Sequence, residues 1–130
     1  YPYSYGYQII QNNIIDNTYF EDIPLKITIT GKMSSPAISL KDAETKEIYS
    51  AIRFDNFNLP ENDELIIDAT QSKVLLKKNG KIYSAYDYIS KAEGLDSFLF
   101  AKANTQTEII VNLDPNENGS IKVSYHQYTL

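Results

Sequence analysis

Hydrophobic and polar residues alternate along several short segments of this 130-residue chain. In residues 25–30, Leu and Ile alternate with Lys and Thr, and a period of two is typical of a strand with one buried face. Segments 64–68 and 73–77 are instead short apolar runs closed by charged residues, which favours more fully buried strands. The alternating segments are residues 25–30, 37–41, 109–113 and 121–125. The pattern therefore predicts strands over most of the chain.

Turn-forming residues separate these segments at intervals of about ten residues, as in β-sandwiches. Asn79-Gly80 is the most specific turn, because both residues tolerate the positive φ that a two-residue type I′ hairpin turn requires. Residues 73–78 and 81–84 are predicted to pair antiparallel across it. The predicted fold is all-β, an antiparallel β-sandwich of jelly-roll or galectin-like type.

One short helix is predicted directly after this hairpin. Ser84 can cap its N-terminus, and Asp87 three residues later completes a capping-box pattern. Only a turn or two can follow before Gly94, so the helix is expected at a corner of a sheet.

Tyrosine alternates with turn-forming residues at the start of the chain, which holds four of its eleven tyrosines. These four are Tyr1, Tyr3, Tyr5 and Tyr7. Because nothing in this stretch is periodic enough to pack alone, residues 1–6 are interpreted as a Tyr/Pro-rich interdomain linker. Residues 7–130 are predicted to form a single β-sandwich domain, a common size for one domain.

Composition narrows the classes of partner. The chain has no cysteine, which excludes disulfides and thiolate metal sites, and it has no run of ~18 apolar residues, so no membrane insertion is expected. The net charge of −5 argues against nucleic-acid binding. A lysine cluster at 73–81 follows an acidic stretch at 55–68, which indicates adjacent strands of opposite charge. We therefore expect proteins or neutral ligands as partners.

Few residues suggest catalysis or metal binding, and neither an enzymatic activity nor a cofactor is predicted. The single histidine, His126, has no cysteine or Gly-x-Ser-x-Gly serine to activate, and is interpreted as an exposed strand residue. Asp114, Asn116 and Asn118 match the start of a calcium loop, but Tyr125 stands where that loop requires a bidentate Glu. Because an ordinary turn uses the same residues, no metal is expected.

Three tyrosines lie in and around the predicted helix, namely Tyr83, Tyr86 and Tyr88. Exposed aromatic rings on a β-sandwich can stack against sugars, so these residues are candidates for a small ligand platform. The same spacing also suits rings that pin the helix to the core, and both interpretations stay open.

Several segments occur in a distinctive order. They are Tyr1-Pro2-Tyr3-Ser4-Tyr5, Ile27-Thr28-Ile29-Thr30-Gly31, Ser35-Pro36-Ala37-Ile38, Asp63-Glu64-Leu65-Ile66-Ile67-Asp68, the Asn79-Gly80 hairpin, Phe98-Leu99-Phe100, Ile109-Ile110-Val111, and Gly119-x-Ile121-x-Val123-x-Tyr125-x-x-Tyr128. In this order they resemble the C-terminal domain of the distal tail proteins, the siphovirus tail component family of bacteriophages with long, non-contractile tails. The chain departs from the family pattern mainly in loops, for example at Ser35, where Asn is usual.

The resemblance implies a peripheral β-sandwich of a phage tail-tip or baseplate hub, a structural virion component that is synthesised in the bacterial host cytoplasm. It implies a preceding N-terminal domain that forms a hexameric ring, joined through Tyr1–Tyr7, while the isolated fragment is expected to be monomeric. Other tail, baseplate and receptor-binding proteins are the expected partners. The alternatives are a carbohydrate-binding module that aids adhesion to host cell-wall polysaccharide, and a non-viral β-sandwich adhesin.

Overall fold

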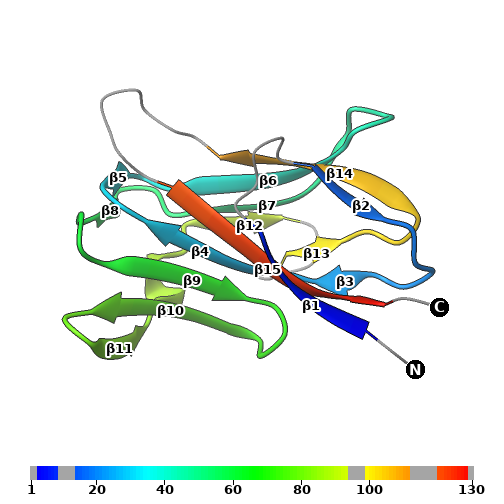
Figure 1. Ribbon diagram of the computed structural model, residues 1–130. Coiled ribbons are helices and arrows are strands. Elements are labelled where there is room, and N and C mark those ends of the chain that lie inside the picture. The colour runs from blue at the N-terminus through cyan, green and yellow to red at the C-terminus, as the bar shows by residue number, and fades with distance from the viewer. Residues whose placement is uncertain (1–2, 9–13, 94–98, 112–119, 129–130) are drawn as a thin grey trace.

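The computed structural model describes residues 3–8, 14–93, 99–111 and 120–128 of the chain (Figure 1). These residues form two main sheets that stack face to face, and every strand pairing in them is antiparallel. Neither sheet closes into a barrel. The predicted all-β sandwich is therefore confirmed.

The larger sheet has six strands in the order β1-β15-β4-β9-β10-β11. Their bounds are β1 Tyr3–Gln8, β4 Lys26–Thr30, β9 Glu64–Asp68, β10 Lys73–Lys78, β11 Lys81–Ser84 and β15 Ser120–Tyr128. Lys73 lies opposite Asp68, and Lys77 lies opposite Glu64. The predicted pairing of oppositely charged strands is thus confirmed.

The smaller sheet has five strands in the order β12-β7-β6-β14-β2. Their bounds are β2 Ile14–Asn17, β6 Ala37–Asp42, β7 Ile48–Arg53, β12 Lys91–Glu93 and β14 Thr105–Val111. Two short pairs accompany the main sheets. They join β3 Ile23–Pro24 to β13 Phe100–Ala101, and β5 Met33–Ser34 to β8 Asn58–Leu59. Of these strands, only β6 and β14 overlap segments that were predicted from alternation, at 37–41 and 109–113.

The hydrophobic core lies between the two sheets and follows the predicted alternation. Ile27 and Ile29 of β4 are fully buried, while the polar residues between them are partly exposed. Strand β9 was predicted to be more fully buried, but Leu65 and Ile67 are buried while Ile66 between them is partly exposed. Phe54 is the largest of the fully buried side chains. Burying one such side chain contributes about 1.5–3 kcal/mol, so the alternation determines which face of each sheet turns inward.

The Asn79-Gly80 hairpin has the predicted geometry. Asn79 and Gly80 have φ of 52° and 76°, as a type I′ turn requires. Lys78 lies opposite Lys81, and the pairing continues to Leu75 and Ser84. The prediction that β10 and β11 are antiparallel neighbours is confirmed.

The predicted short helix is a single 3-10 turn, η1 Tyr86–Tyr88, and its predicted cap is wrong. Ser84 is the last residue of β11, and Ala85 stands at the N-cap without a side-chain capping bond. The backbone N–H of Ala85 still donates to the Val74 carbonyl at 2.8 Å, which continues the β10–β11 ladder past Ser84. The helix therefore starts too late for Ser84 and Asp87 to form a capping box. No helix of the described residues is long and apolar enough to span a membrane.

Strand β1 includes most of the opening tyrosine segment. It pairs along its whole length with β15, from Tyr3 opposite Tyr128 to Gln8 opposite Val123. The backbone of residues 3–6, predicted as linker, thus belongs to an edge strand of the larger sheet. A role for this segment in joining a preceding domain stays a prediction.

Candidate functional site

The three candidate tyrosines lie at one corner of the sandwich, on β11 and on η1. Tyr83, Tyr86 and Tyr88 are 49%, 41% and 44% exposed, so none of them is a core residue. Tyr83 lies opposite the nearly buried Leu76, on the same face of the sheet, and is the side chain of this cross-strand pair that lies on the edge strand β11. The tyrosyl hydroxyl of Tyr86 donates to the Ser72 carbonyl at 2.9 Å, which ties η1 to the turn between β9 and β10.

A fourth ring, which the sequence did not single out, joins this corner. Phe57 stacks on Tyr88 with ring centroids 4.6 Å apart and an interplanar angle of 25°. Phe57 is itself partly buried, and its ring centroid lies 6.4 Å from that of the core residue Phe54. The exposed Tyr88 ring is therefore anchored to the core through Phe57. We call Phe57, Tyr83, Tyr86 and Tyr88 the aromatic corner.

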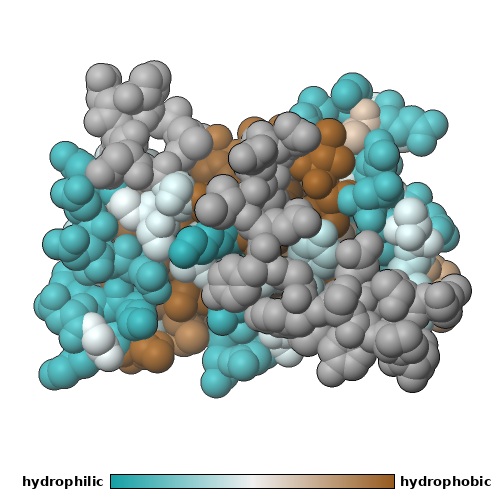
Figure 2. Space-filling view, viewed as in Figure 1, coloured by the Kyte–Doolittle hydropathy of each residue, from teal (hydrophilic) through white to brown (hydrophobic). Residues whose placement is uncertain are grey.

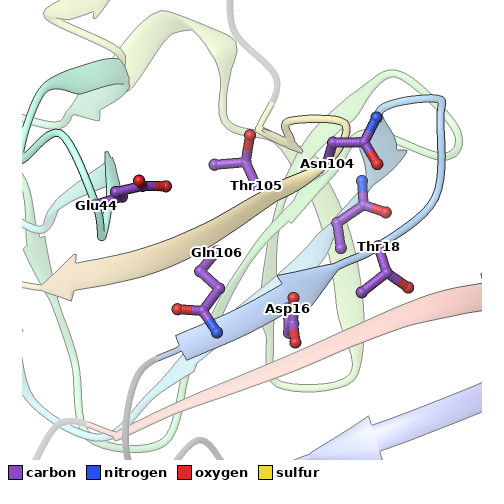
Figure 3. Close-up of a pocket in the computed structure, with 7 residues that line it drawn as sticks. Asp16, Thr18, Glu44, Asn104, Thr105 and Gln106 are labelled. Atoms are coloured by element: carbon purple, nitrogen blue, oxygen red, sulfur yellow. The ribbon is translucent and has the colours of Figure 1, made fainter.

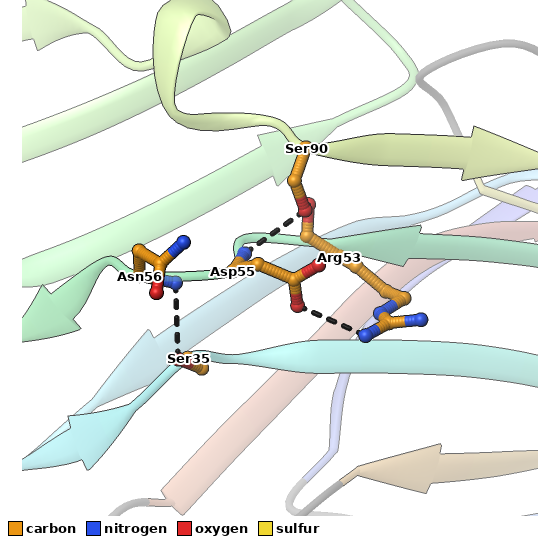
Figure 4. Close-up of polar contacts among 5 residues, drawn as sticks. All are labelled: Ser35, Arg53, Asp55, Asn56 and Ser90. Carbon is orange, nitrogen blue, oxygen red and sulfur yellow. Dashed lines mark hydrogen bonds and ion pairs between the residues drawn. The ribbon is translucent and has the colours of Figure 1, made fainter.

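A set of polar contacts holds the segment before Phe57 against the segment after η1 (Figure 4). The Asp55 backbone N–H donates to Ser90 Oγ at 2.9 Å, and that hydroxyl donates to the Arg53 carbonyl at 3.1 Å. On the other side, the Asn56 N–H donates to Ser35 Oγ at 3.2 Å. Arg53 Nη2 also pairs with Asp55 Oδ1 at 3.1 Å, but both side chains are about half exposed, so this pair contributes at most about 1 kcal/mol.

A second polar cluster holds β13 and the residues after it. The Tyr49 hydroxyl lies 2.7 Å from Thr107 Oγ1 and accepts the Lys102 N–H at 3.1 Å. Burial raises the pKa of the Tyr49 hydroxyl, although the hydrogen bonds with Thr107 and Lys102 oppose the shift. The side-chain amide of Asn17 donates to the Ala101 carbonyl at 3.0 Å. These contacts are structural, and no periodic pattern in the sequence marks them.

A shallow hollow of about 250 Å³ lies at the ends of β2 and β14 (Figure 3). It is lined by Asp16, Asn17, Thr18, Glu44, Asn104, Thr105 and Gln106. Ligand sites are commonly apolar and measure about 300–1,000 Å³, whereas this hollow is smaller and lined by polar residues. A second hollow, of about 230 Å³, lies beside β5 and β8. Neither has the character of an enclosed ligand site.

The side chains that the sequence suggested as metal ligands lie outside the described part of the structure. The calcium-like residues Asp114, Asn116 and Asn118 lie outside the described residues. The backbone of His126 belongs to β15, opposite Tyr5, but its side chain is not described. Among the side chains that are described, no group of three or more His, Cys, Asp or Glu residues is arranged to hold a metal ion.

The most prominent surface features of the described residues are exposed aromatic rings on a braced corner and, next to them, the edge strand β11, whose four residues are all exposed. Such features suit contact with another macromolecule or with a sugar.

The sequence matches no protein-family model, and a search of the curated proteins also finds no match. Among solved structures, the fold is similar to that of the SPP1 Dit protein (gp 19.1), which is described as a paradigm of the hub adsorption apparatus in phages that infect Gram-positive bacteria. The TM-score is 0.67 at 7% sequence identity. The match covers 99% of this chain and 48% of that protein, so the chain spans about half its length. At this identity the likeness shows a common fold.

Proposed function

We propose that this chain is a structural domain of a phage tail tip, a peripheral β-sandwich that presents a docking surface to other tail, baseplate or receptor-binding proteins. The observation that carries the proposal is the match of nearly the whole chain to about half of a phage hub protein. Motif order in the sequence resembles the same class of protein. A non-catalytic role also agrees with the described surface, which offers exposed rings and a strand edge.

The positions of Tyr3 and Tyr128 support the proposed attachment to a ring-forming domain. Tyr3 and Tyr128 lie opposite each other, so the two ends of the described chain are adjacent at one end of the larger sheet. The Asn79-Gly80 turn is at the other end, on the side of Thr30 and Glu64 (Figure 1). In this proposal a hexameric ring holds the end near Tyr3, and the lysine-rich hairpin points away from it.

The test is to locate the chain in virions. An antiserum raised against the purified chain, applied to phage particles whose genome encodes it, should place immunogold label at the end of the tail distal to the capsid. Serum that has been absorbed with the purified chain is the control and should give no label. Absence of the chain from purified particles by mass spectrometry, or label on the capsid, would reject the proposal.

A carbohydrate-binding module is the second candidate, because Tyr83, Tyr86 and Tyr88 are exposed on a corner whose backbone is braced. Titration with host cell-wall polysaccharide should then show millimolar or tighter binding that Tyr86→Ala removes. Phe20 is an aromatic residue outside this corner and is 68% exposed, so Phe20→Ala is the matched control. Equal binding by both variants, or no binding to any host polysaccharide, would reject this candidate.

A further inference from the structure

Strand β11 forms an open edge of the larger sheet. In a two-residue hairpin the two residues that flank the turn exchange both backbone hydrogen bonds; here they are Lys78 and Lys81. Along the two strands, hydrogen-bonded pairs then alternate with non-hydrogen-bonded pairs. The bond from the Ala85 N–H to the Val74 carbonyl falls on a pair that this alternation makes hydrogen-bonded. Ile82 and Ser84 therefore direct their backbone N–H and C=O groups away from β10. Within the described part of the chain, no hydrogen bond reaches these outward groups.

The side chains of β11 offer apolar contacts on both faces of this edge. Ile82 is 61% exposed and lies opposite Lys77 on the outer face, whereas Tyr83 continues the inner row beside Leu76. Figure 2 shows hydrophobic side chains among hydrophilic ones over this part of the sheet. Exposed edges are commonly protected by short strands, charged side chains such as Lys, proline or bulges. Strand β11 is short and has Lys81 at its start, but Ile82 and Tyr83 leave apolar side chains exposed on both of its faces.

The charge around this edge selects the kind of partner. Residues 73–84 contain four lysines and no acidic residue, although the whole chain carries a net charge of −5. Lys78 lies 3.6 Å from Asp63, but Lys81 makes no ion pair with a described residue. A second copy of the chain would bring a β11 that also lacks acidic residues. An extended segment with acidic residues complements the edge better.

We propose that β11 binds an extended, acidic segment of a partner protein by β-strand addition. The segment places an Asp or Glu beside Lys81 and apolar residues beside Ile82 and Tyr83, and its backbone pairs with Ile82 and Ser84. That the segment comes from another tail protein is the part of the inference that rests on the proposed function. The binding mode itself is testable with synthetic peptides.

The probe is a short fluorescent peptide with consecutive valines between glutamates at both ends, so that apolar side chains lie on both faces and either strand direction fits. Its control has lysine in place of glutamate. In low salt, fluorescence anisotropy should show at least about tenfold tighter binding of the acidic peptide, and added salt should reduce the difference. Hydrogen exchange should slow at the Ile82 and Ser84 amides and stay unchanged at Lys81 and Tyr83, which are already bonded.

Three variants distinguish binding through the β11 backbone from nonspecific binding. Ile82→Pro removes one outward N–H without removing a β10–β11 bond, because proline is tolerated at solvent-facing edge positions. Ile82→Lys adds a positive charge and removes the apolar contact, and Ile48→Lys makes the same change on β7 at a residue of similar exposure, 57%. Ile82→Pro should weaken acidic-peptide binding about tenfold, whereas Ile48→Lys should not change it. Melting curves by circular dichroism confirm that each variant is folded.

Several results would overturn the proposal. They are equal affinity for both peptides, unchanged binding by Ile82→Pro, and slowed exchange at another strand edge. A dimer of the free chain that Ile82→Pro dissociates would identify a second copy as the occupant instead. Tail-tip immunogold label together with failed peptide binding would reject the β11 site alone. Peptide binding by a chain that is absent from virions would reject only the tail-tip function.

Discussion

Asn17 offers the sharpest test of how this fold is held together. It is 1% exposed, and its side-chain amide donates to the carbonyls of Glu21 and Ala101 at 3.0 Å each. The Lys102 carbonyl lies 3.3 Å from the same nitrogen. Its Oδ1 accepts the Tyr19 backbone N–H at 2.9 Å. One side chain therefore joins β2, the loop that follows it and the end of β13.

The perturbation is Asn17→Asp, which keeps the shape and the bond from the Tyr19 N–H but replaces the donor amide by a carboxylate oxygen. The carbonyls of Glu21 and Ala101 then lose their donor. A buried carbonyl left without a partner costs about 1–3 kcal/mol, and the bond to the Glu21 carbonyl is only part-buried, so the expected loss at pH 7 is about 2–4 kcal/mol. This is a large share of the roughly 5–15 kcal/mol that stabilises a typical domain.

The penalty should depend on pH. Burial among carbonyl oxygens raises the pKa of the introduced carboxyl in the folded state above its unfolded value of about 3.9. The folded variant therefore binds a proton more tightly than the unfolded one. Its penalty is full above the raised pKa and shrinks as the pH falls towards about 4, because a protonated carboxyl can donate one hydrogen bond.

Urea denaturation followed by circular dichroism at pH 7 and pH 5 measures this difference, with the wild-type chain as the reference at each pH. Asp16→Asn is the matched control, because it makes the reverse change at the exposed neighbouring residue and should alter stability by less than about 0.5 kcal/mol. A variant within about 0.5 kcal/mol of wild type at pH 7, or a penalty that grows on acidification, would refute this account of Asn17.

Three further predictions concern the hairpin, a buried hydroxyl and the state of association. Gly80→Val should cost more than about 1 kcal/mol in a urea titration, since a β-branched residue at φ 76° is strained although the space around it is open. Gly80→Asn should cost less, because Asn tolerates positive φ, and equal costs for the two variants would mean that backbone strain at positive φ does not cause the loss. Tyr49→Phe should cost about 1–2 kcal/mol at pH 7 through the lost bonds with Thr107 and with the Lys102 N–H. Because the folded pKa of Tyr49 is raised, this stabilisation is complete below about pH 10 and declines above it, so the difference between variant and wild type should narrow there; a gap that widens would contradict the assignment. Light scattering at tens of micromolar should give a mass near 14.8 kDa, and a stable trimer or hexamer would show that this domain carries its own assembly surface.

The sequence by itself determined most of the larger sheet. Strand β4 has an apolar–polar order that can be buried on one face only, so its boundaries and inward face followed from the pattern, while the short apolar runs at 64–68 and 73–77 marked β9 and β10 as strands. The Asn79-Gly80 turn was equally predictable, because few residues adopt positive φ at two consecutive positions without strain. Opposite charges on β9 and β10 also indicated their pairing.

Strand β7 shows where the pattern failed. Its exposed Ile48 and its buried Ser50 invert the usual order of apolar and polar positions. The pairing with β6 shifts between Leu40 and Lys41, where Lys41 lies opposite Ile48 and Leu40 lies opposite Ser50. Such an irregularity places an extra residue in one strand. The extra residue interrupts the two-residue alternation of apolar and polar positions, so β7 could be recognised only from its pairing with β6 in the structure.

The features of the candidate site needed the tertiary structure for a related reason. Phe57 and Tyr88 are far apart in sequence, and the contacts of Ser90 with Arg53 and Asp55, together with the pairing of β12 with β7, bring their segments together. Local sequence could mark Tyr88 as a candidate but could not name its partner. The exposure of Ile82 likewise depends on β11 being the last strand of its sheet, and strand order is decided by long-range packing of whole strands, which leaves no local pattern in the residues of β11.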